Sequence, residues 1–140
     1  MTTSPLIASM FRLVHSFKAC LSAELEAEGL SIAPTHMKVL KIISAMDECT
    51  AQRIAQSIHR DKAQVNRVVQ ELVAKEMVER KQNPTDKRSQ LLHLSEKGNV
   101  ALTSMNAIEH RVLCRMTHGI NVESQQTFIT LAEKLRSNLQ

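Results

Sequence analysis

The chain has 140 residues, with 18 basic and 14 acidic side chains, 43% hydrophobic residues and three phenylalanines as its only aromatic residues. This length suits one domain, or two small modules that share a core, and the balance of charged and apolar residues excludes a disordered or low-complexity chain. No segment approaches the roughly 18 uninterrupted apolar residues of a membrane span, and the first thirty residues already carry several charges, so we expect neither membrane contact nor a signal peptide.

The three cysteines stand far apart, at positions 20, 49 and 114, and no pair has a metal-binding or disulfide-framework spacing. An odd number of widely spaced cysteines is typical of a reducing compartment. We therefore expect a cytoplasmic protein.

The excess positive charge is confined to the middle third of the chain. Residues 53–97 hold ten basic and six acidic side chains, which accounts for the whole net charge of +4, whereas the other residues hold eight of each sign. A polyanionic partner for this segment explains the concentration, and an ordinary solvated surface is the alternative.

Apolar residues at steps of three and four predict four helices in the first half of the chain. The first runs from Leu6 to near Gly29, and the second begins at Pro34 and has about twelve residues. Thr50 is a suitable N-cap for a short third helix. After a three-residue turn at 59–61, Asp61 and Gln64 have the spacing of a capping box, and the fourth helix continues through Val73.

The apolar spacing changes from a helical to a strand period after Met77. We predict strands at Met77–Gln82 and Gln90–Leu94, joined by turn-forming residues with basic Lys87 and Arg88 at the tip. A long fifth helix capped by Ser95 ends near Gly119, and a last helix reaches the terminus. The predicted fold class is mainly α with a small β-hairpin wing.

A helix, a three-residue turn, a helix and a basic hairpin form, in this order, the winged helix–turn–helix, whose second helix enters the DNA major groove. The outward face of the fourth helix is polar and, apart from Arg67, uncharged. Amide and guanidinium groups are those that recognise adenine and guanine edges. The predicted DNA-binding residues are Arg53, Arg60, Lys62, Ala63, Gln64, Asn66, Arg67, Gln70, Asp86, Lys87 and Arg88.

Asp86 and Arg88 are separated by one residue, so on an extended tip their side chains point to the same side. We predict that the carboxylate holds the guanidinium in one rotamer, which suits insertion into a narrow minor groove. The alternative is an exposed ion pair that stabilises the fold by about 0 to 1 kcal/mol and has no further role.

These segments resemble the MarR family of bacterial transcriptional regulators. The resemblance covers essentially the whole chain in order and length and is sharpest from residue 50 to 98. Its most specific part is the Asp86-Lys87-Arg88 wing followed by Leu-Ser-Glu-Lys-Gly at 94–98, and it also includes 32–36, 50–55, 61–67 and 72–80. One departure is Glu76, where the family usually has a glycine that closes the recognition helix. Either this cap is strained or the helix ends differently.

The resemblance implies a homodimer on a pseudo-palindromic operator in double-stranded DNA. Residues 1–30 and 99–140 would supply the dimerisation helices, and residues 31–98 the winged helix–turn–helix lobe. It implies that Arg88, oriented by Asp86, enters the minor groove, and that the fourth helix contacts the major groove through Gln64, Asn66 and Arg67. The strong apolar stripes at both ends of the chain independently favour a partner chain.

The resemblance also implies a repressor that a small lipophilic anion, such as a phenolic or aromatic acid, releases from DNA. Arg12, His15 and Lys18 on the first helix are candidate ligands for its carboxylate, or else the solvated edge of that helix. Some family members sense peroxide through a first-helix cysteine, but without any tyrosine to assist, Cys20 is interpreted as buried and inert.

His110, Cys114 and His118 follow each other at intervals of four on the predicted fifth helix. Histidine and cysteine one turn apart can share a zinc ion, which would make a metal- or redox-responsive regulator. A polar helix face is the favoured interpretation, so no metal site is predicted.

Glycine-rich phosphate loops, HExxH and Gly-x-Ser-x-Gly are absent from the sequence, so we predict a binding protein without a cofactor rather than an enzyme. The rival function is a winged helix that binds other proteins and not DNA. It would require apolar anchors on the outer face of the fourth helix.

Overall fold

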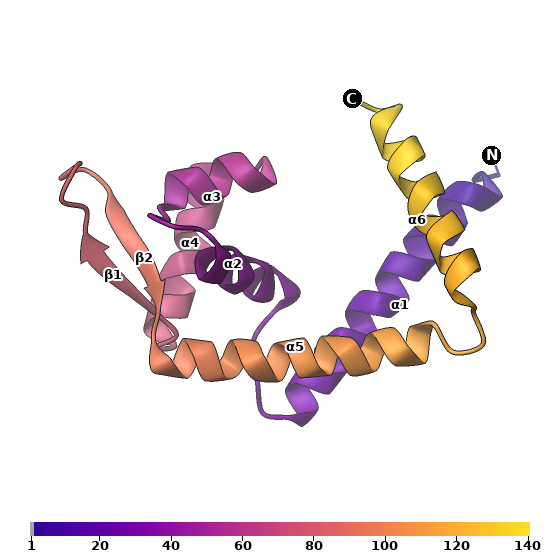
Figure 1. The fold of residues 1–140 in the computed structure, drawn as a ribbon, viewed down its shortest axis with the longest axis horizontal. Helices are drawn as coiled ribbons and strands as arrows, with labels where there is room; N and C mark the ends of the chain where they lie inside the picture. The colour runs from indigo at the N-terminus through magenta and orange to yellow at the C-terminus, as the bar shows by residue number, and fades with distance from the viewer. Residues whose placement is uncertain (1) are drawn as a thin grey trace.

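The computed structural model describes residues 2–140 and shows six helices and one antiparallel hairpin within them (Figure 1). The helices are α1 (Pro5–Ala27), α2 (Pro34–Ala45), α3 (Ala51–Ile58), α4 (Lys62–Ala74), α5 (Glu96–Met116) and α6 (Val122–Ser137), and the strands are β1 (Val78–Gln82) and β2 (Gln90–Leu94). The predicted fold class is confirmed, and each predicted element is present within a few residues of its expected bounds. Met1, which begins the predicted dimerisation segment, lies outside the described residues.

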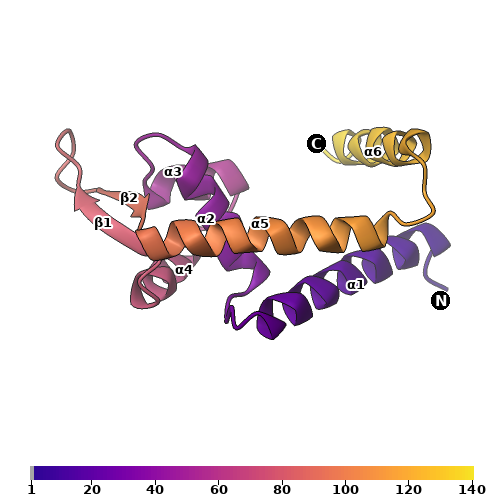
Figure 2. The same ribbon diagram turned by 60° about the horizontal axis from the view of Figure 1, so that its bottom comes forward.

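The long helix α5 connects two parts of the molecule. Figures 1 and 2 show α2, α3, α4 and the hairpin gathered around one end of α5, whereas α1 and α6 lie toward its other end. Helix α6 turns back after the loop at Gly119, whose φ of 76° is in the left-handed region that favours glycine. Among the described helices, none combines the length and apolar character needed to cross a bilayer.

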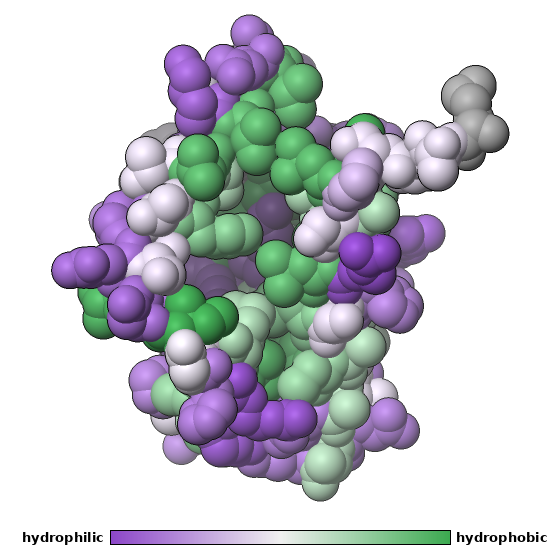
Figure 3. Space-filling model, turned by 90° about the vertical axis from the view of Figure 1, so that its right-hand side faces the viewer, coloured by the Kyte–Doolittle hydropathy of each residue, from purple (hydrophilic) through white to green (hydrophobic). Residues whose placement is uncertain are grey.

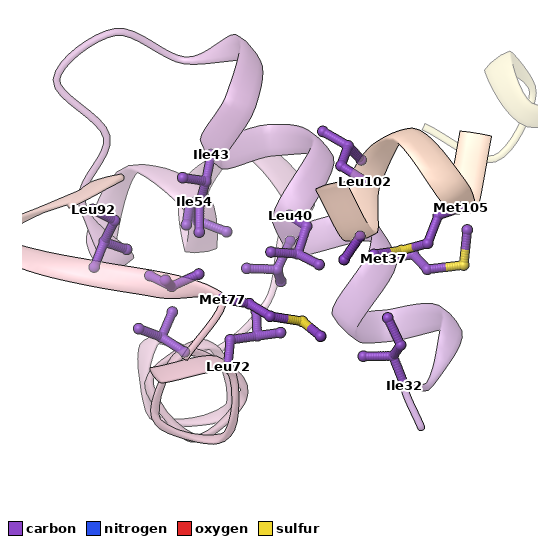
Figure 4. Packing of buried hydrophobic residues seen from close by; sticks show 14 of the residues in the cluster. Ile32, Met37, Leu40, Ile43, Ile54, Leu72, Met77, Leu92, Leu102 and Met105 are labelled. Atoms are coloured by element: carbon purple, nitrogen blue, oxygen red, sulfur yellow. The ribbon is translucent and has the colours of Figure 1, made fainter. Parts of the chain in front are cut away.

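One apolar core joins the two parts. Leu25 of α1, Leu40 of α2, Ile54 of α3, Leu72 of α4 and Met105 of α5 are completely buried in the same cluster. Figure 4 shows Leu102 and Met105 of α5 packed beside Met37 and Leu40 of α2. Because protein interiors are close-packed, this shared core holds the α2–β2 lobe in a fixed orientation on α5.

The apolar stripe predicted for the first helix divides into two halves. Leu21 and Leu25 are buried, but the residues nearer the N-terminus face solvent, among them Met10 and Phe11, which is 73% exposed. Helix α6 contains no buried residue at all. The sequence pattern therefore identified real apolar faces, but this chain alone does not cover them.

The helix starts use the caps that the sequence predicts, with one difference. Thr50 Oγ1 accepts a hydrogen bond from Arg53 N–H at 3.2 Å, and Ser95 Oγ accepts from Gly98 N–H at 3.0 Å. Asp61 Oδ1 accepts instead from Ala63 N–H, at 3.2 Å, so the Asp61–Gln64 capping box is not formed. The carboxylate reaches the second amide of the helix and not the third, and this still satisfies one exposed donor.

The residues that follow α4 are in close contact with the start of α5. Ser95 Oγ donates to the Glu76 carbonyl at 2.6 Å, and Ser95 N–H donates to the Met77 carbonyl at 3.0 Å. Gly98 packs so closely here that a Cβ atom on it would lie 2.0 Å from the Met77 carbonyl oxygen. Only glycine permits so close a contact with the backbone of Met77, which explains the glycine three residues after Ser95 in the sequence.

The sequence left open whether Glu76 forms a strained helix cap or the helix ends differently. The structure shows the strained cap. The φ of Glu76 is 62°, in the left-handed region, directly after the C-terminal turn of α4. Its carboxylate lies 3.8 Å from Lys97 Nζ, a pair that is largely exposed and contributes little.

We predict that Glu76→Gly stabilises the protein. Relief of about 1 to 2 kcal/mol of left-handed strain outweighs the roughly 0.4 to 1 kcal/mol lost through a more flexible unfolded chain. The free energy of unfolding from urea denaturation should therefore rise by up to about 1 kcal/mol. The matched control is Lys75→Gly, because Lys75 has an ordinary φ of −82° and should lose stability. Equal effects of the two substitutions would contradict the strain.

Candidate nucleic-acid interface

The turn between α3 and α4 sets the orientation of α4. His59 adopts a left-handed conformation with φ 53°, and Asp61 then caps α4. The inward side chains Val65, Val69 and Leu72 are buried. Because these residues fix the rotation of the helix about its axis, the opposite face with Ala63, Gln64, Arg67 and Gln70 is exposed, as predicted.

The wing is ordered by hydrogen bonds within its own turn. Asn83 Oδ1 accepts from Thr85 N–H at 3.1 Å and from Thr85 Oγ1 at 2.8 Å. Asp86 Oδ1 accepts from the backbone N–H of Arg88 at 2.9 Å. Within residues 2–140 no ion pair joins Asp86 to the Arg88 guanidinium, so the predicted rotamer lock is not formed and the carboxylate instead fixes the backbone of the tip. In a tight turn, an aspartate is better placed to accept from the backbone N–H two residues on, as in an Asx turn, than to pair with the side chain of that residue.

The base of the wing is fastened to the loop before α3. Leu92 N–H in β2 donates to the Cys49 carbonyl at 2.8 Å, and Arg80 pairs with Leu92 across the hairpin. Cys49 is 1% exposed, and burial raises the pKa of its thiol, an effect that the nearby Arg53 charge only partly offsets. Its thiol is therefore a neutral packing group, and the backbone hydrogen bond connects the wing to the loop before α3.

A groove of about 460 Å³ lies between α3, α4 and the wing. It brings Lys62, Asn66 and Gln70 of the recognition helix together with Lys87 and Arg88 of the wing. Sequence reasoning had placed these residues on one DNA-binding surface without showing that they share a groove. Four basic residues and no acidic residue line it; the complete lining is Thr50, Ala51, Gln52, Lys62, Asn66, Val69, Gln70, Arg80, Lys87, Arg88, Ser89, Gln90 and Leu92.

Arg80 and Gln52 also line this groove and were missed from the sequence. The pairing of β1 with β2 places Arg80 beside Leu92, and Leu92 is held against the loop before α3. Strand alternation from buried Val78 gave a signal for Arg80, since residues two apart share a face. Gln52 had no such signal.

The other predicted recognition residues lie on the opposite flank of α4. A second hollow, of about 270 Å³, is lined by Arg60, Gln64 and Arg67 together with His36 and Glu71. His36 Nδ1 accepts from Ala33 N–H at 2.9 Å, so its Nε2 carries the proton donated to Glu71 Oε2 at 2.5 Å. This contact between the first turn of α2 and the last turn of α4 further fixes the position of α4.

Residues 32–90 match the family model described as "MarR family". This segment of the chain is therefore similar to the MarR family. The matched segment spans α2, α3, α4, β1 and the tip of the wing, and it ends at Gln90, the first residue of β2.

Solved structures of MarR proteins share the fold over nearly the whole chain. A mutant MarR from E. coli complexed with operator DNA is 23% identical, with a TM-score of 0.84 over 94% of this chain and 93% of that one. A MarR protein from Peptoclostridium difficile is 19% identical, with a TM-score of 0.84 over 99% and 90%. A probable transcriptional regulator from Pseudomonas aeruginosa is 19% identical, with a TM-score of 0.82 over 94% and 97%.

The structure gives Arg53 a different place from the one expected on the DNA-binding surface. Its Nη1 donates to the carbonyls of Asp47 at 2.5 Å and Glu48 at 3.1 Å. Glu48 has a positive φ of 50°, so the guanidinium closes a strained loop after α2. Arg53 is turned back onto its own chain, because two carbonyl acceptors lie within reach of its long side chain.

The candidate effector ligands are not gathered around a hollow. Arg12, His15 and Lys18 are all exposed on α1. A hollow of about 250 Å³ between α1 and α5 is lined by other residues, which are Leu13, Ser16, Phe17, Cys20, Val112, Arg115 and Met116. Cys20, expected to be buried, is half-buried at this hollow.

Two of the three weak metal-ligand candidates come together. His110 Nε2 lies 3.6 Å from Cys114 Sγ on α5. His118 lies beyond the end of α5 at Met116, and no group of three metal-ligating side chains is formed in the described part of the chain.

We predict that Arg53→Ala lowers stability, because two carbonyls of the 46–50 loop lose their donor. The loss should be about 1 kcal/mol in the free energy of unfolding, measured by urea denaturation. The neighbouring Gln52→Ala is the control, since Gln52 is exposed and donates no hydrogen bond to this loop in the described structure. If Arg53→Ala unfolded at the same urea concentration as wild type, the loop contact would not stabilise the fold.

Proposed function

We propose that this protein is a transcriptional regulator that binds a specific, pseudo-palindromic site in double-stranded DNA as a homodimer. The groove between the recognition helix and the wing is the observation that carries the proposal. It combines amide groups suited to base edges, Asn66 and Gln70, with cations suited to phosphates. The MarR from E. coli that shares the fold was solved with operator DNA, which supports the same type of partner here.

The two flanks of α4 divide the proposed contacts. Lys62 and the wing residues Lys87 and Arg88 face the groove, so they suit the backbone and the adjoining minor groove. Gln64 and Arg67, on the other flank, remain exposed for base contacts in the major groove. Ala63 is exposed between the two flanks of α4, and its small side chain would allow DNA to approach the helix closely.

The proposed dimer would join two chains through residues 1–30 and 99–140, leaving residues 31–98 as the DNA-binding lobe. Figure 3 views the end where α1 and α6 lie, and hydrophobic residues gather there around a central hollow. A monomer rarely exposes so many large apolar side chains together. The exposed residues of α1, of the last turns of α5, of the α5–α6 loop, and of α6 and the residues after it are Leu6, Ile7, Met10, Phe11, Leu13, Val14, Leu113, Met116, Ile120, Val122, Phe128, Ile129, Leu131, Leu135 and Leu139.

A second copy of this chain is the occupant that best fits this surface. The apolar residues come from both ends of the chain, and α6 is exposed along its whole length. An isolated helix of 16 residues is only marginally stable in water, so α6 needs a partner. A two-fold dimer also presents two lobes to two half-sites of an operator, as a palindromic site requires.

The regulator proposed here is a repressor in the cytoplasm, released by a small lipophilic anion such as an aromatic acid. The hollow between α1 and α5 is largely apolar and borders the surface assigned to the partner chain. Arg12, His15 and Lys18 stand exposed on the same helix as candidate carboxylate ligands. Arg115, which lines the hollow, is a further cation that the sequence did not single out.

The rival function, a winged helix that docks only on proteins, is less well supported. It needs apolar anchors on the outer face of α4, but the exposed side chains there are Gln64, Arg67 and Gln70, beside small Ala63. The basic groove would have no role in apolar docking.

We predict that selection from a random duplex pool at near-physiological salt enriches a two-fold-related site with half-sites about one helical turn apart. Affinity for that site should then fall steeply with rising salt, because each phosphate contact releases counterions. Sedimentation should give two chains per site. A confirmed dimer that enriches no sequence, or whose binding hardly responds to salt, would instead favour the protein-docking module.

We predict that Arg88→Ala weakens binding to the selected site by about tenfold or more without loss of the dimer, because the substitution removes the proposed contact between the guanidinium and DNA.

Substitutions of Asp86 distinguish two explanations of how this residue supports the wing. Asp86→Asn keeps an acceptor for Arg88 N–H and should bind nearly as wild type, whereas Asp86→Ala loses this acceptor and should weaken binding. If Asn and Ala weakened binding equally, the negative charge and not the backbone bond would be what matters.

A further inference from the structure

His110 and Cys114 form a side-chain pair on α5 that lies outside the groove proposed to bind DNA. The two residues are one helical turn apart, and Cys114 Sγ lies 3.6 Å from His110 Nε2. Both are exposed, on the face of α5 opposite the buried residues Met105, Ile108 and Val112. The pair is therefore open to a small ligand from solvent.

The separation of sulfur and nitrogen matches that of two ligands on one zinc ion. Zinc lies at about 2.3 Å from a thiolate sulfur and at about 2.0 to 2.1 Å from an imidazole nitrogen, in tetrahedral geometry. At a tetrahedral angle these bond lengths place sulfur and nitrogen about 3.6 Å apart. The helix holds the two ligands at this distance before any ion binds, so little side-chain freedom is lost on binding.

The local charge balance also permits a cation at this position. Each ligand is followed along the chain by an arginine, and both guanidinium groups engage carboxylates of α1. Arg111 Nη2 lies 2.5 Å from Glu28 Oε1 and 3.7 Å from Glu24 Oε2, and Arg115 Nη1 lies 3.1 Å from Glu24 Oε1. These contacts hold the positive charges against α1 and offset them there.

We propose that His110 and Cys114 form a two-ligand site for a thiophilic closed-shell metal ion of the Zn²⁺ class. The thiol gives up its proton to the solvent when the metal–sulfur bond forms, and His110 binds through Nε2 as the neutral imidazole. Water fills the remaining positions around the ion. His118 is not a ligand, since α5 ends before it and the described residues contain no group of three ligands.

The test is a titration of the reduced, full-length protein with Cd²⁺, followed by the ultraviolet charge-transfer band of cadmium thiolate, with Zn²⁺ as competitor. Wild type should show a saturable band with one Cd²⁺ per chain, reversed by Zn²⁺. Binding should weaken as the pH falls, because protons compete for both ligands. Cys114→Ser should lose the band, and His110→Ala should bind at least tenfold more weakly.

Two variants serve as controls, one at a cysteine of α1 and one at the histidine that follows the end of α5. Cys20→Ser and His118→Ala should bind as wild type, because neither residue contacts the pair in the structure. Far-ultraviolet circular dichroism checks that each variant keeps its helices, as expected for three exposed positions and for the half-buried Cys20. Absence of the band in wild type, equal affinity of His110→Ala and wild type, or equal weakening by His118→Ala would each overturn the site.

Discussion

The contact between the end of α4 and the start of α5 is the constraint on which the rest of the structure depends. Ser95 binds the Glu76 and Met77 carbonyls, and Gly98 lies against Met77 without room for a side chain. Helix α4 ends at this contact, and the wing and α5 begin there. A small displacement would therefore change the direction of all three elements. The strained backbone of Glu76 and the requirement for glycine at position 98 destabilise the chain locally but keep this geometry fixed.

The apolar core extends this constraint along the first half of α5. Met105 and Ile108 are completely buried in the core that α5 shares with α1 and the α2–β2 lobe. Beyond Val112 the chain changes character, because Leu113, Met116 and every apolar side chain of α6 face solvent. The molecule is thus well packed at one end and incomplete at the other, a distribution expected of a protomer and not of a monomer.

Most of the fold could be predicted from the sequence because each element carries its own local signal. Apolar spacing gave the helices, Thr50 and Ser95 gave two caps, and the strand bounds of β2 were predicted correctly. The same spacing could not distinguish an apolar face that is buried within the chain from one that stays exposed on it. In α1 a single apolar stripe includes buried Leu25 and exposed Phe11, and the sequence does not show where the buried part of the stripe ends.

The candidate site was harder to predict where long or short polar side chains choose among several partners. The outward face of α4 followed directly from helix geometry. Arg53, however, donates to two nearby carbonyls of its own chain, and Asp86 accepts from a backbone amide and does not pair with a guanidinium. Such choices depend on which acceptor lies within about 3 Å in the folded chain, and periodicity carries no information at that scale. Arg80 entered the groove through strand pairing, which is a long-range contact.

The fixed junction limits how the proposed regulator can be switched. The core and the Ser95–Gly98 contacts join each lobe to its own α5, so the distance between two lobes in a dimer is set by how the helices beyond Val112 meet. A ligand shifts that distance only if it binds one arrangement more tightly than the other. The hollow between α1 and α5 lies at this boundary, with Val112 and Met116 among its lining residues. A molecule seated there contacts the part of α5 whose packing the chain leaves open, and this is where small differences in binding energy can alter the spacing of rigid lobes.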